Sequence, residues 1–367
     1  MRAPASALRP LADCLSLDPD RARTRFADTC VDWRSVLHLS NLELVAPTLA
    51  SRLARLGGGT LPPEMRDYLA LLHQLNGERN VALRGQALAL ILALNGADIR
   101  PVLLKGAAAL FADVYGDPAA RMIGDLDILV PHERLDASLA VLADLGYRLG
   151  DRYPDGHHAY GEFVRPGDAG AVDLHVEPID ASYLLPADEM RSRARSLSRD
   201  DAQFSLPCPT DRLLHNILHA QIHHRAEFYR GVFRLRQLHD GAMIARALAP
   251  EIDWAHIEAR FGAYRLGPAL QAYALAAHEL FGLPWPLASR PTLGARVHYR
   301  RCLLQRQLPL LAATAVPLAN LRHGFAWHRL DHLYGGDAGT LPRMARHARQ
   351  FAHKARARGV IAQLFRT

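Results

Sequence analysis

Two aspartates, Asp125 and Asp127, lie two residues apart in the segment 121–130, which has the sequence RMIGDLDILV. The apolar residues around them predict a β-strand over residues 123–130. Side chains two residues apart on a strand project from the same face, so both carboxylates would point to one place. Close carboxylates repel one another unless a cation lies between them, and oxygen ligands suit Mg²⁺ or Mn²⁺. The alternative is a solvated edge strand with no ligand.

A third carboxylate, Asp173, lies in another alternating segment that predicts a strand over 171–176. His175 and Glu177 share its face of the strand. A glycine-containing turn at 166–170 would join this strand to one predicted over 160–165. If the Asp173 strand also neighbours the Asp125 strand, three carboxylates meet, as in two-metal sites for phosphoryl or nucleotidyl transfer.

An apolar strand predicted over 99–104 ends at Lys105 and Gly106, where an Ala-rich helix begins. Glycine lets the backbone approach a ligand closely, and the free N–H groups of a helix start attract phosphate. Lys105 and Arg121 are candidate cations that would stabilise charge developing on phosphoryl oxygens. Either residue could instead be an ordinary solvated charge.

Three further polar residues lie between these motifs. Tyr115 could stack on a nucleotide base or cap the end of a helix. Asp113 and Asp117 are acidic, but they belong to the connecting helix and turn, and neither is expected to bind metal.

The order of these motifs resembles the nucleotidyltransferase superfamily with the DNA-polymerase-β-like fold, and more narrowly its largely uncharacterised bacterial branch. The resemblance covers roughly residues 80–285 and rests on Leu-Lys-Gly at 104–106, Arg-x-x-Gly-Asp-Leu-Asp-Ile-Leu-Val at 121–130 and Val-Asp-Leu-His at 172–175. Lys105 and Gly106 stand where the superfamily has a Gly-Ser or Gly-Gly pair. The gap from Gly106 to Asp125 is also longer than in the superfamily.

The resemblance implies an α+β fold, with a small mixed β-sheet, helices on one side and α-helical regions flanking it. It implies transfer of a nucleoside monophosphate from a nucleoside triphosphate to an acceptor hydroxyl or phosphate, with release of pyrophosphate. The site residues that it implies are metal ligands Asp125, Asp127 and Asp173, catalytic Arg121, and substrate-binding Lys105, Gly106, Gly124 and His175. The cofactor would be Mg²⁺ or Mn²⁺, and the acceptor a small molecule or peptide, as in natural-product tailoring, or an RNA.

Four regions follow from this organisation. They are an N-terminal helical region (1–98), the nucleotidyltransferase core (99–185), a helical domain covering the active site (186–285) and a basic C-terminal helical region (286–367). Apolar periodicity predicts helices over 37–56, 60–94, 132–145, 211–224, 231–248, 254–261 and 266–280. After Pro186 the chain is expected to be entirely helical.

Three histidines at helical spacing, His215, His219 and His223, form a stripe on the predicted helix 211–224, with His224 beside it. Such a stripe could bind zinc, line a nucleotide pocket or form a buried polar seam. The next helix carries the polar residues Arg234, Arg236, His239 and Asp240. The resemblance places His219, Arg236 and Asp240 at the active site, and the alternative for them is a buried salt-bridge network.

The composition bounds the remaining possibilities. A net charge of +7 over 367 residues weakly favours acidic partners such as nucleotides. The four cysteines are scattered without metal-ligand spacing, which favours a reducing cytoplasm. No signal peptide is evident at the start, and the apolar run 308–321 is short and interrupted by Pro317, so no membrane span is expected. The basic segment 343–358 could contact RNA, a membrane or an acidic peptide, or simply be solvated.

Three alternatives to nucleotidyl transfer remain open. The same metal site could serve a transferase that uses a nucleotide-sugar donor to modify a phosphorylated peptide or natural product. The chain could be an antitoxin or scaffold with a degenerate site, although the presence of all three carboxylates disfavours this. An HD-type phosphohydrolase is suggested by His239 and Asp240 but lacks a clear downstream aspartate.

Overall fold

The computed structural model describes residues 5–57, 59–154, 157–223 and 226–334. The chain divides into two compact units. The first comprises Met1–Asn216, Leu235–Asp253 and Ala277–Pro284, and the second comprises Ile217–Arg234, Trp254–Ala276 and Trp285–Thr367. His224 and the basic segment 343–358 lie outside the described residues.

The first unit begins with short helices. They are η1 (Ala5–Ala7), α1 (Leu8–Cys14), α2 (Pro19–Ala27), α3 (Trp33–Leu42) and α4 (Ala46–Leu56). The side chains of Asp18 and Asp32 cap α2 and α3 by accepting hydrogen bonds from amides of the first turn. The helical pattern predicted over 37–56 is divided between α3 and α4, because Leu44 adopts a φ of 57°, which a right-handed helix cannot contain.

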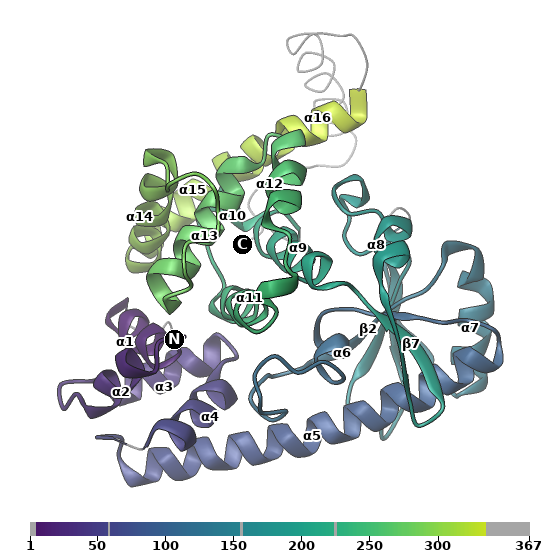
Figure 1. Cartoon of the computed structure of the whole chain (residues 1–367), viewed down its shortest axis with the longest axis horizontal. Helices are drawn as coiled ribbons and strands as arrows, with labels where there is room; N and C mark the ends of the chain where they lie inside the picture. Colours follow the sequence, from purple (N-terminus) through teal and green to yellow (C-terminus); the bar gives the residue numbers. More distant parts are fainter. Residues whose placement is uncertain (1–4, 58, 155–156, 224–225, 335–367) are drawn as a thin grey trace. The chain divides into compact units, whose positions relative to one another are not determined.

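The long helix α5 (Pro63–Gly96) links these short helices to the sheet. In Figure 1 it runs from beside α4 to the sheet. It begins with a proline, whose missing N–H costs nothing in the first turn. Near its end, Asn95 donates hydrogen bonds to the carbonyl groups of Ile99 and Gln203, at 3.0 and 2.8 Å. The bounds of α5 confirm the helix predicted over 60–94.

The first unit contains a seven-stranded mixed sheet with the order β3-β4-β5-β2-β1-β7-β6. Its strands are β1 (Val102–Leu103), β2 (Asp125–Leu129), β3 (Arg148–Arg152), β4 (Ala159–Val164), β5 (Ala171–His175), β6 (Arg195–Arg199) and β7 (Ala202–Leu206). The central pair β2 and β5 is parallel, and β4 and β5 form the predicted antiparallel hairpin. The predicted α+β class with a small mixed sheet is confirmed.

The two faces of the sheet differ in chemistry because side chains alternate along each strand. Leu126, Ile128, Val172 and Leu174 belong to one buried apolar cluster that also contains residues of α5 and of α7 (Leu135–Asp144). The intervening residues therefore project from the opposite face. These are Asp125 and Asp127 on β2 and Asp173 and His175 on β5. The hydrophobic core thus fixes the direction in which the acidic side chains point.

The sheet continues beyond Pro186, where only helices were predicted, because β6 and β7 form a hairpin. Asp200 and Asp201 make its two-residue turn with φ values of 49° and 67°. Two positive φ values are typical of the type I′ turns that join hairpin strands, and aspartate tolerates them. Strand β6 lies at the edge of the sheet, where its terminal arginines discourage pairing with another chain. Strand β3 was also not predicted.

The remaining elements are helical. In the order of the chain they are α6 (Lys105–Ala109), η2 (His132–Arg134), η3 (Ser182–Leu184), α8 (Ala187–Arg193), α9 (Pro209–Gln221), α10 (Glu227–Arg230), α11 (Leu235–Ala247), η4 (Ala249–Glu251), α12 (Trp254–Ala263), α13 (Gly267–Phe281), α14 (Leu293–Gln307), α15 (Pro309–Gly324) and α16 (Trp327–Tyr334). Within the second unit, Arg301 and Gln305 of α14 donate hydrogen bonds to the carbonyl groups of Tyr229 and Arg230. These bonds tie α14 to the end of α10.

Helix α15 contains most of the apolar run 308–321, for which no membrane span was expected, with Pro317 inside it. Across the parts of the chain that the structure describes, the helices are all too short or too polar to cross a bilayer.

Candidate active site

Strands β2 and β5 bring the predicted carboxylates together. Asp127 lies directly opposite Asp173 in the parallel register, and Asp125 lies opposite Ala171. The expectation that the two strands are neighbours is therefore confirmed. The side chain of Asp127 is only 2% exposed and that of Asp173 is 14% exposed, whereas Asp125 at the start of β2 reaches solvent. The carboxylates thus form a cluster that is closed at one end and open at the other.

Asp127 is the centre of this cluster. One of its oxygens, Oδ1, accepts hydrogen bonds from Lys105 Nζ at 2.6 Å and from His175 Nε2 at 3.0 Å. Burial raises the pKa of Asp127, but Lys105 and His175 outweigh burial and hold it well below its usual range. Asp127 is therefore an anion at neutral pH, as a metal ligand must be.

His175 connects Asp127 to Asp173. Its Nε2 lies 3.0 Å from Asp127 Oδ1 and 3.1 Å from Asp173 Oδ2, while its Nδ1 lies 3.2 Å from the carbonyl oxygen of Glu177. Burial and the charge of Lys105 lower the pKa of His175, but the hydrogen bonds to the two aspartates outweigh them and the pKa is raised. All three groups that face the ring are acceptors, which fits a doubly protonated imidazole.

Lys105 contacts an aspartate instead of lying free at the predicted phosphate loop. It starts α6 with a φ of 41°, and its ammonium group pairs with Asp127. Burial lowers the pKa of Lys105, but the charge of Asp127 more than offsets this and the pKa is raised. The Ala-rich helix that follows is only five residues long, so its attraction for anions is small.

Gly106 has a steric role that the sequence did not show. A Cβ atom at this position would lie 2.9 Å from Ile123 Cγ2 and 3.0 Å from Arg121 Nη1. Ile123 is buried, and Arg121 is held by an ion pair to Asp240, so neither can withdraw easily. The absence of a side chain at Gly106 therefore allows α6 to pack against the segment before β2.

We expect Gly106→Ala to lower the free energy of unfolding by about 1–3 kcal/mol, because the added methyl group overpacks this contact. Urea denaturation would measure the change. Gly85→Ala is a matched control, since Gly85 lies within α5 and a Cβ there meets no atom within 4 Å. That variant should be neutral or slightly stabilising because alanine favours helices. Equal stability of the two variants would contradict the steric role.

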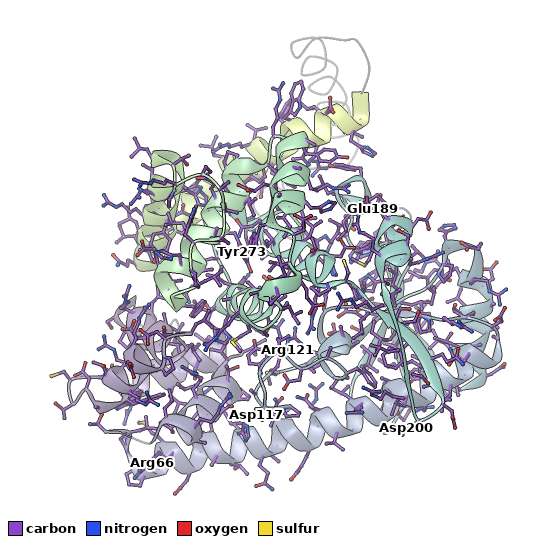
Figure 2. The ribbon with its side chains drawn as sticks, in the orientation of Figure 1. Arg66, Asp117, Arg121, Glu189, Asp200 and Tyr273 are labelled. Atoms are coloured by element: carbon purple, nitrogen blue, oxygen red, sulfur yellow. The ribbon has the colours of Figure 1, made fainter. Side chains whose placement is uncertain are left out.

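Arg121, Tyr115 and Asp240 form a buried polar group. Arg121 donates to both carboxylate oxygens of Asp240, with Nη2 2.9 Å from Oδ2, and the Tyr115 hydroxyl donates to Oδ1. Burial and the charge of Asp240 raise the pKa of Tyr115 well above its usual range. Tyr115 is buried and its hydroxyl group is bonded to Asp240, so it is not available to stack on a base. The salt-bridge alternative describes Asp240, and the alternative of a solvated charge does not describe Arg121. The catalytic role of Arg121 and the substrate-binding role of Asp240 stay predictions. Figure 2 labels Arg121.

Asp125 carries a less compensated charge than Asp127. Desolvation by the surrounding protein and the negative charge of Asp127 raise the pKa of Asp125 to about 6. The positive charges of Lys105 and Arg236 oppose this rise only in part. Arg236 of α11 is thus close enough to act on Asp125 electrostatically. Gly124 precedes Asp125, and a Cβ there would meet no atom within 4 Å, so the backbone is accessible at this point.

The cluster fits a divalent cation. Ligand atoms of Asp127, Asp173 and His175 lie within 4.8 Å of one another, and the two aspartates supply the donor oxygens because a doubly protonated His175 has no free lone pair. Asp173 Oδ1 is buried, and no hydrogen-bond partner reaches it from the described residues. A buried oxygen without a partner is costly unless a ligand satisfies it. With Asp125 beside this group, the donors are mainly hard oxygens, which suit Mg²⁺ or Mn²⁺.

The predicted histidine stripe is divided between the two units, with His215 in the first and His219 and His223 in the second. His215 of α9 lies 3.1 Å from the carbonyl oxygen of Pro178, and burial lowers its pKa to about 3. His219 and His223 belong to the second unit, where their ring centroids are 5.1 Å apart. Among the described residues, none of these three histidines belongs to a group with metal-ligand spacing. The role of His219 therefore stays a prediction.

Two acidic residues excluded as ligands have structural partners. Asp117 accepts hydrogen bonds from Ser51 and His73, and Asp113 accepts one from the amide of Tyr115. Conversely, His158 was not predicted as a site residue. Its ring lies 4.9 Å from that of His175. The sequence signal that could have indicated it is the adjacent pair His157 and His158 directly before a strand.

Comparison with known proteins gives the family. The model of a family described as "Uncharacterised nucleotidyltransferase" matches residues 29–282, which is more than half of the chain. The solution structure of the antibiotic-resistance factor ANT(2'')-Ia is similar at 13% sequence identity, covering 55% of this chain and 98% of that one, with a TM-score of 0.37. Curated proteins give no match. The resemblance inferred from the motifs is confirmed by the family match, and the chain belongs to this family of nucleotidyltransferases.

Proposed function

We propose that the protein is a divalent-metal-dependent enzyme that transfers a nucleoside monophosphate from a nucleoside triphosphate to an acceptor hydroxyl or phosphate, releasing pyrophosphate. Family membership supports nucleotidyl transfer in general. The observation that carries the finer proposal is Asp173 Oδ1, a buried carboxylate oxygen without a hydrogen-bond partner among the described residues, directly across from Asp127. A cation would satisfy this oxygen.

In this proposal Asp125, Asp127 and Asp173 hold Mg²⁺ or Mn²⁺. When bound, the metal would neutralise charge on the transferred phosphoryl group and favour deprotonation of the attacking hydroxyl. Alternatively, Asp173 would act through Oδ1 as the general base for the acceptor hydroxyl, and Asp125 and Asp127 alone would then hold the metal. His175 holds Asp127 and Asp173 in register through its Nε2.

The cations around the carboxylates would bind the donor phosphates. Lys105 lowers the pKa of Asp127 and Arg236 opposes the rise in the pKa of Asp125, whereas Arg121 lowers the pKa of the neighbouring Asp240. We propose that Lys105 binds phosphate once a metal compensates Asp127. Gly106 and Gly124 would let the backbone approach the donor, while Asp240 would position Arg121 instead of contacting substrate.

The acceptor is proposed to be a small molecule or peptide, with RNA as a further option, and His219 is retained as a substrate-binding candidate on the family resemblance alone. The four cysteines, Cys14, Cys30, Cys208 and Cys302, are free thiols. Free thiols are in keeping with a reducing compartment and support the proposed cytoplasmic location.

Isothermal titration of the full chain with ATP, CTP, GTP, UTP and a few nucleotide-sugars, each with and without Mg²⁺, tests the proposal. We expect one triphosphate to bind at least about tenfold more tightly with Mg²⁺, because the carboxylates would hold the metal and the metal would neutralise charge on the donor phosphates. Asp125→Asn should remove this metal dependence without unfolding the protein, since Asp125 reaches solvent. Equal binding with and without metal would contradict the proposal. Preferential binding of a nucleotide-sugar would instead favour the sugar-transferring alternative.

A further inference from the structure

A second group of metal-ligating side chains lies outside the carboxylate cluster. It consists of His157, His158 and Asp180, whose ligand atoms lie within 4.8 Å of one another. The two histidines precede β4, and the aspartate follows β5. Antiparallel pairing of these strands, with Ala159 opposite His175, brings the three residues to the same end of the hairpin. The carbonyl group of His158 accepts hydrogen bonds from the amides of Val176 and Glu177, which fixes the backbone there.

The distances are close to those of a metal site. Asp180 Oδ1 lies 2.6 Å from His158 Nδ1 and 3.7 Å from His157 Nε2. Ligands about 2.0–2.1 Å from a tetrahedral zinc ion are roughly 3.3 Å from one another. The two distances lie on either side of this spacing, so small side-chain rotations would bring the three atoms around one ion. The amide of His158 also donates to Asp180 Oδ1, which orients the carboxylate.

His157 can take the tautomer that metal-binding histidines usually have. His157 Nδ1 lies 3.2 Å from both the carbonyl oxygen and the amide nitrogen of Ala159. Nδ1 accepts from the amide when it is unprotonated and donates to the carbonyl when it is protonated; in the second tautomer Nε2, 3.7 Å from Asp180 Oδ1, carries the lone pair that a metal needs. Metal-ligating histidines commonly donate their second ring N–H to a backbone carbonyl in this way. The His158 ring is held between those of His157 and His175, at centroid distances of 4.1 and 4.9 Å.

The cluster opens into a cavity of about 350 Å³. Arg152, Tyr153, Tyr160 and Glu177 line it together with the three cluster residues. Asp180 is 51% exposed and His157 26% exposed, so an ion can reach them from solvent. Three protein ligands leave a fourth position for a water molecule or for an oxygen of a bound molecule, as catalytic zinc sites do.

We propose that His157, His158 and Asp180 form a second divalent-metal site, for a transition metal such as Zn²⁺, with its open coordination position toward this cavity. Two imidazole nitrogens and one carboxylate suit Zn²⁺, Co²⁺ or Ni²⁺, whereas Mg²⁺ prefers oxygen ligands. The site therefore differs in metal preference from the carboxylate cluster. It does not depend on which reaction the protein catalyses.

Metal titration of the full chain, stripped with chelator, tests the site. Asp173→Asn is introduced in every sample to weaken the carboxylate cluster. We expect this background protein to retain one equivalent of Zn²⁺ after desalting, measured by elemental analysis, and to give visible d–d absorption with Co²⁺. Adding His157→Gln or Asp180→Asn should weaken binding by at least about tenfold, as the loss of a ligand does.

His132→Gln is the matched control, because His132 lines the same cavity outside the three-residue group. It should bind Zn²⁺ as tightly as the background protein. Circular dichroism would verify that each variant is folded. If Asp180→Asn does not fold, the Zn²⁺ affinity of His157→Gln alone tests the site, because His157 is partly exposed and its substitution should be tolerated. Unchanged Zn²⁺ affinity in a folded His157→Gln protein would overturn the proposal. An equal loss in His132→Gln would do the same.

Discussion

Asp127→Asn is expected to lower the rate of nucleotidyl transfer by about three orders of magnitude or more. Asp127 is the most buried of the three carboxylates, and one of its oxygens contacts both Lys105 and His175. Asparagine keeps the size of the side chain but removes the negative charge that would hold the metal. Losing several kcal/mol of transition-state stabilisation corresponds to a factor of this size.

The measurement is pyrophosphate release from the triphosphate that binds best, with the acceptor supplied once it is known and water as acceptor until then. Asp144→Asn, at the exposed end of α7, is the matched control and should retain the wild-type rate. Transfer by Asp127→Asn within tenfold of wild type would rule out the proposed metal site.

Stability must be measured on the same variant, because the change also breaks an ion pair in which Asp127 is fully buried. Removing one partner of such a pair leaves Lys105 uncompensated and can cost about 3 kcal/mol. Thermal unfolding would detect this loss. Asp173→Asn separates the two effects, since Asp173 Oδ1 has no hydrogen-bond partner among the described residues and the substitution removes no lysine contact. It should lose transfer with a smaller loss of stability.

The sequence predicted the features that depend on local pattern. Alternation along β2 and β5 placed Asp125, Asp127 and Asp173 on one face, and the paired strands in the structure confirm that arrangement. Helix α5 was predicted because its apolar residues recur at helical spacing between a proline start and an Asn-Gly end. Local spacing thus sufficed for the central strands and the carboxylates that they carry.

The features that were missed depend on residues far apart in the sequence. Arg121 was considered a free cation, but its partner Asp240 lies 119 residues away, and nothing local to either residue indicates the pair. Lys105 pairs with Asp127, 22 residues away, and has a positive φ that no local pattern indicates. The β6–β7 hairpin was missed because its turn uses Asp200 and Asp201 instead of the more recognisable glycine.

Asp240→Ala is expected to lower the free energy of unfolding by about 3–5 kcal/mol, which makes it the largest stability effect anticipated here. The side chain of Asp240 is only 6% exposed, and that of its partner Arg121 is 15% exposed. Removing the carboxylate leaves the guanidinium group of Arg121 and the hydroxyl group of Tyr115 without their shared acceptor. An uncompensated buried charge of this kind accounts for the expected magnitude.

Thermal melting would show the loss as a decrease in Tm of about 10 °C. Asp20→Ala is the matched control, because Asp20 forms a comparable contact with Arg23 at 2.7 Å, but with side chains that are 87% and 56% exposed. Exposed ion pairs contribute little, so this variant should melt close to wild type.

Combining Arg121→Met with Asp240→Ala should restore part of the lost stability, because the double variant buries no unpaired charge. If Asp240→Ala has the same Tm as the Asp20→Ala control, the contacts of Asp240 with Arg121 and Tyr115 do not stabilise the first unit. If the double variant melts below both single variants, the unpaired charge is not the source of the loss.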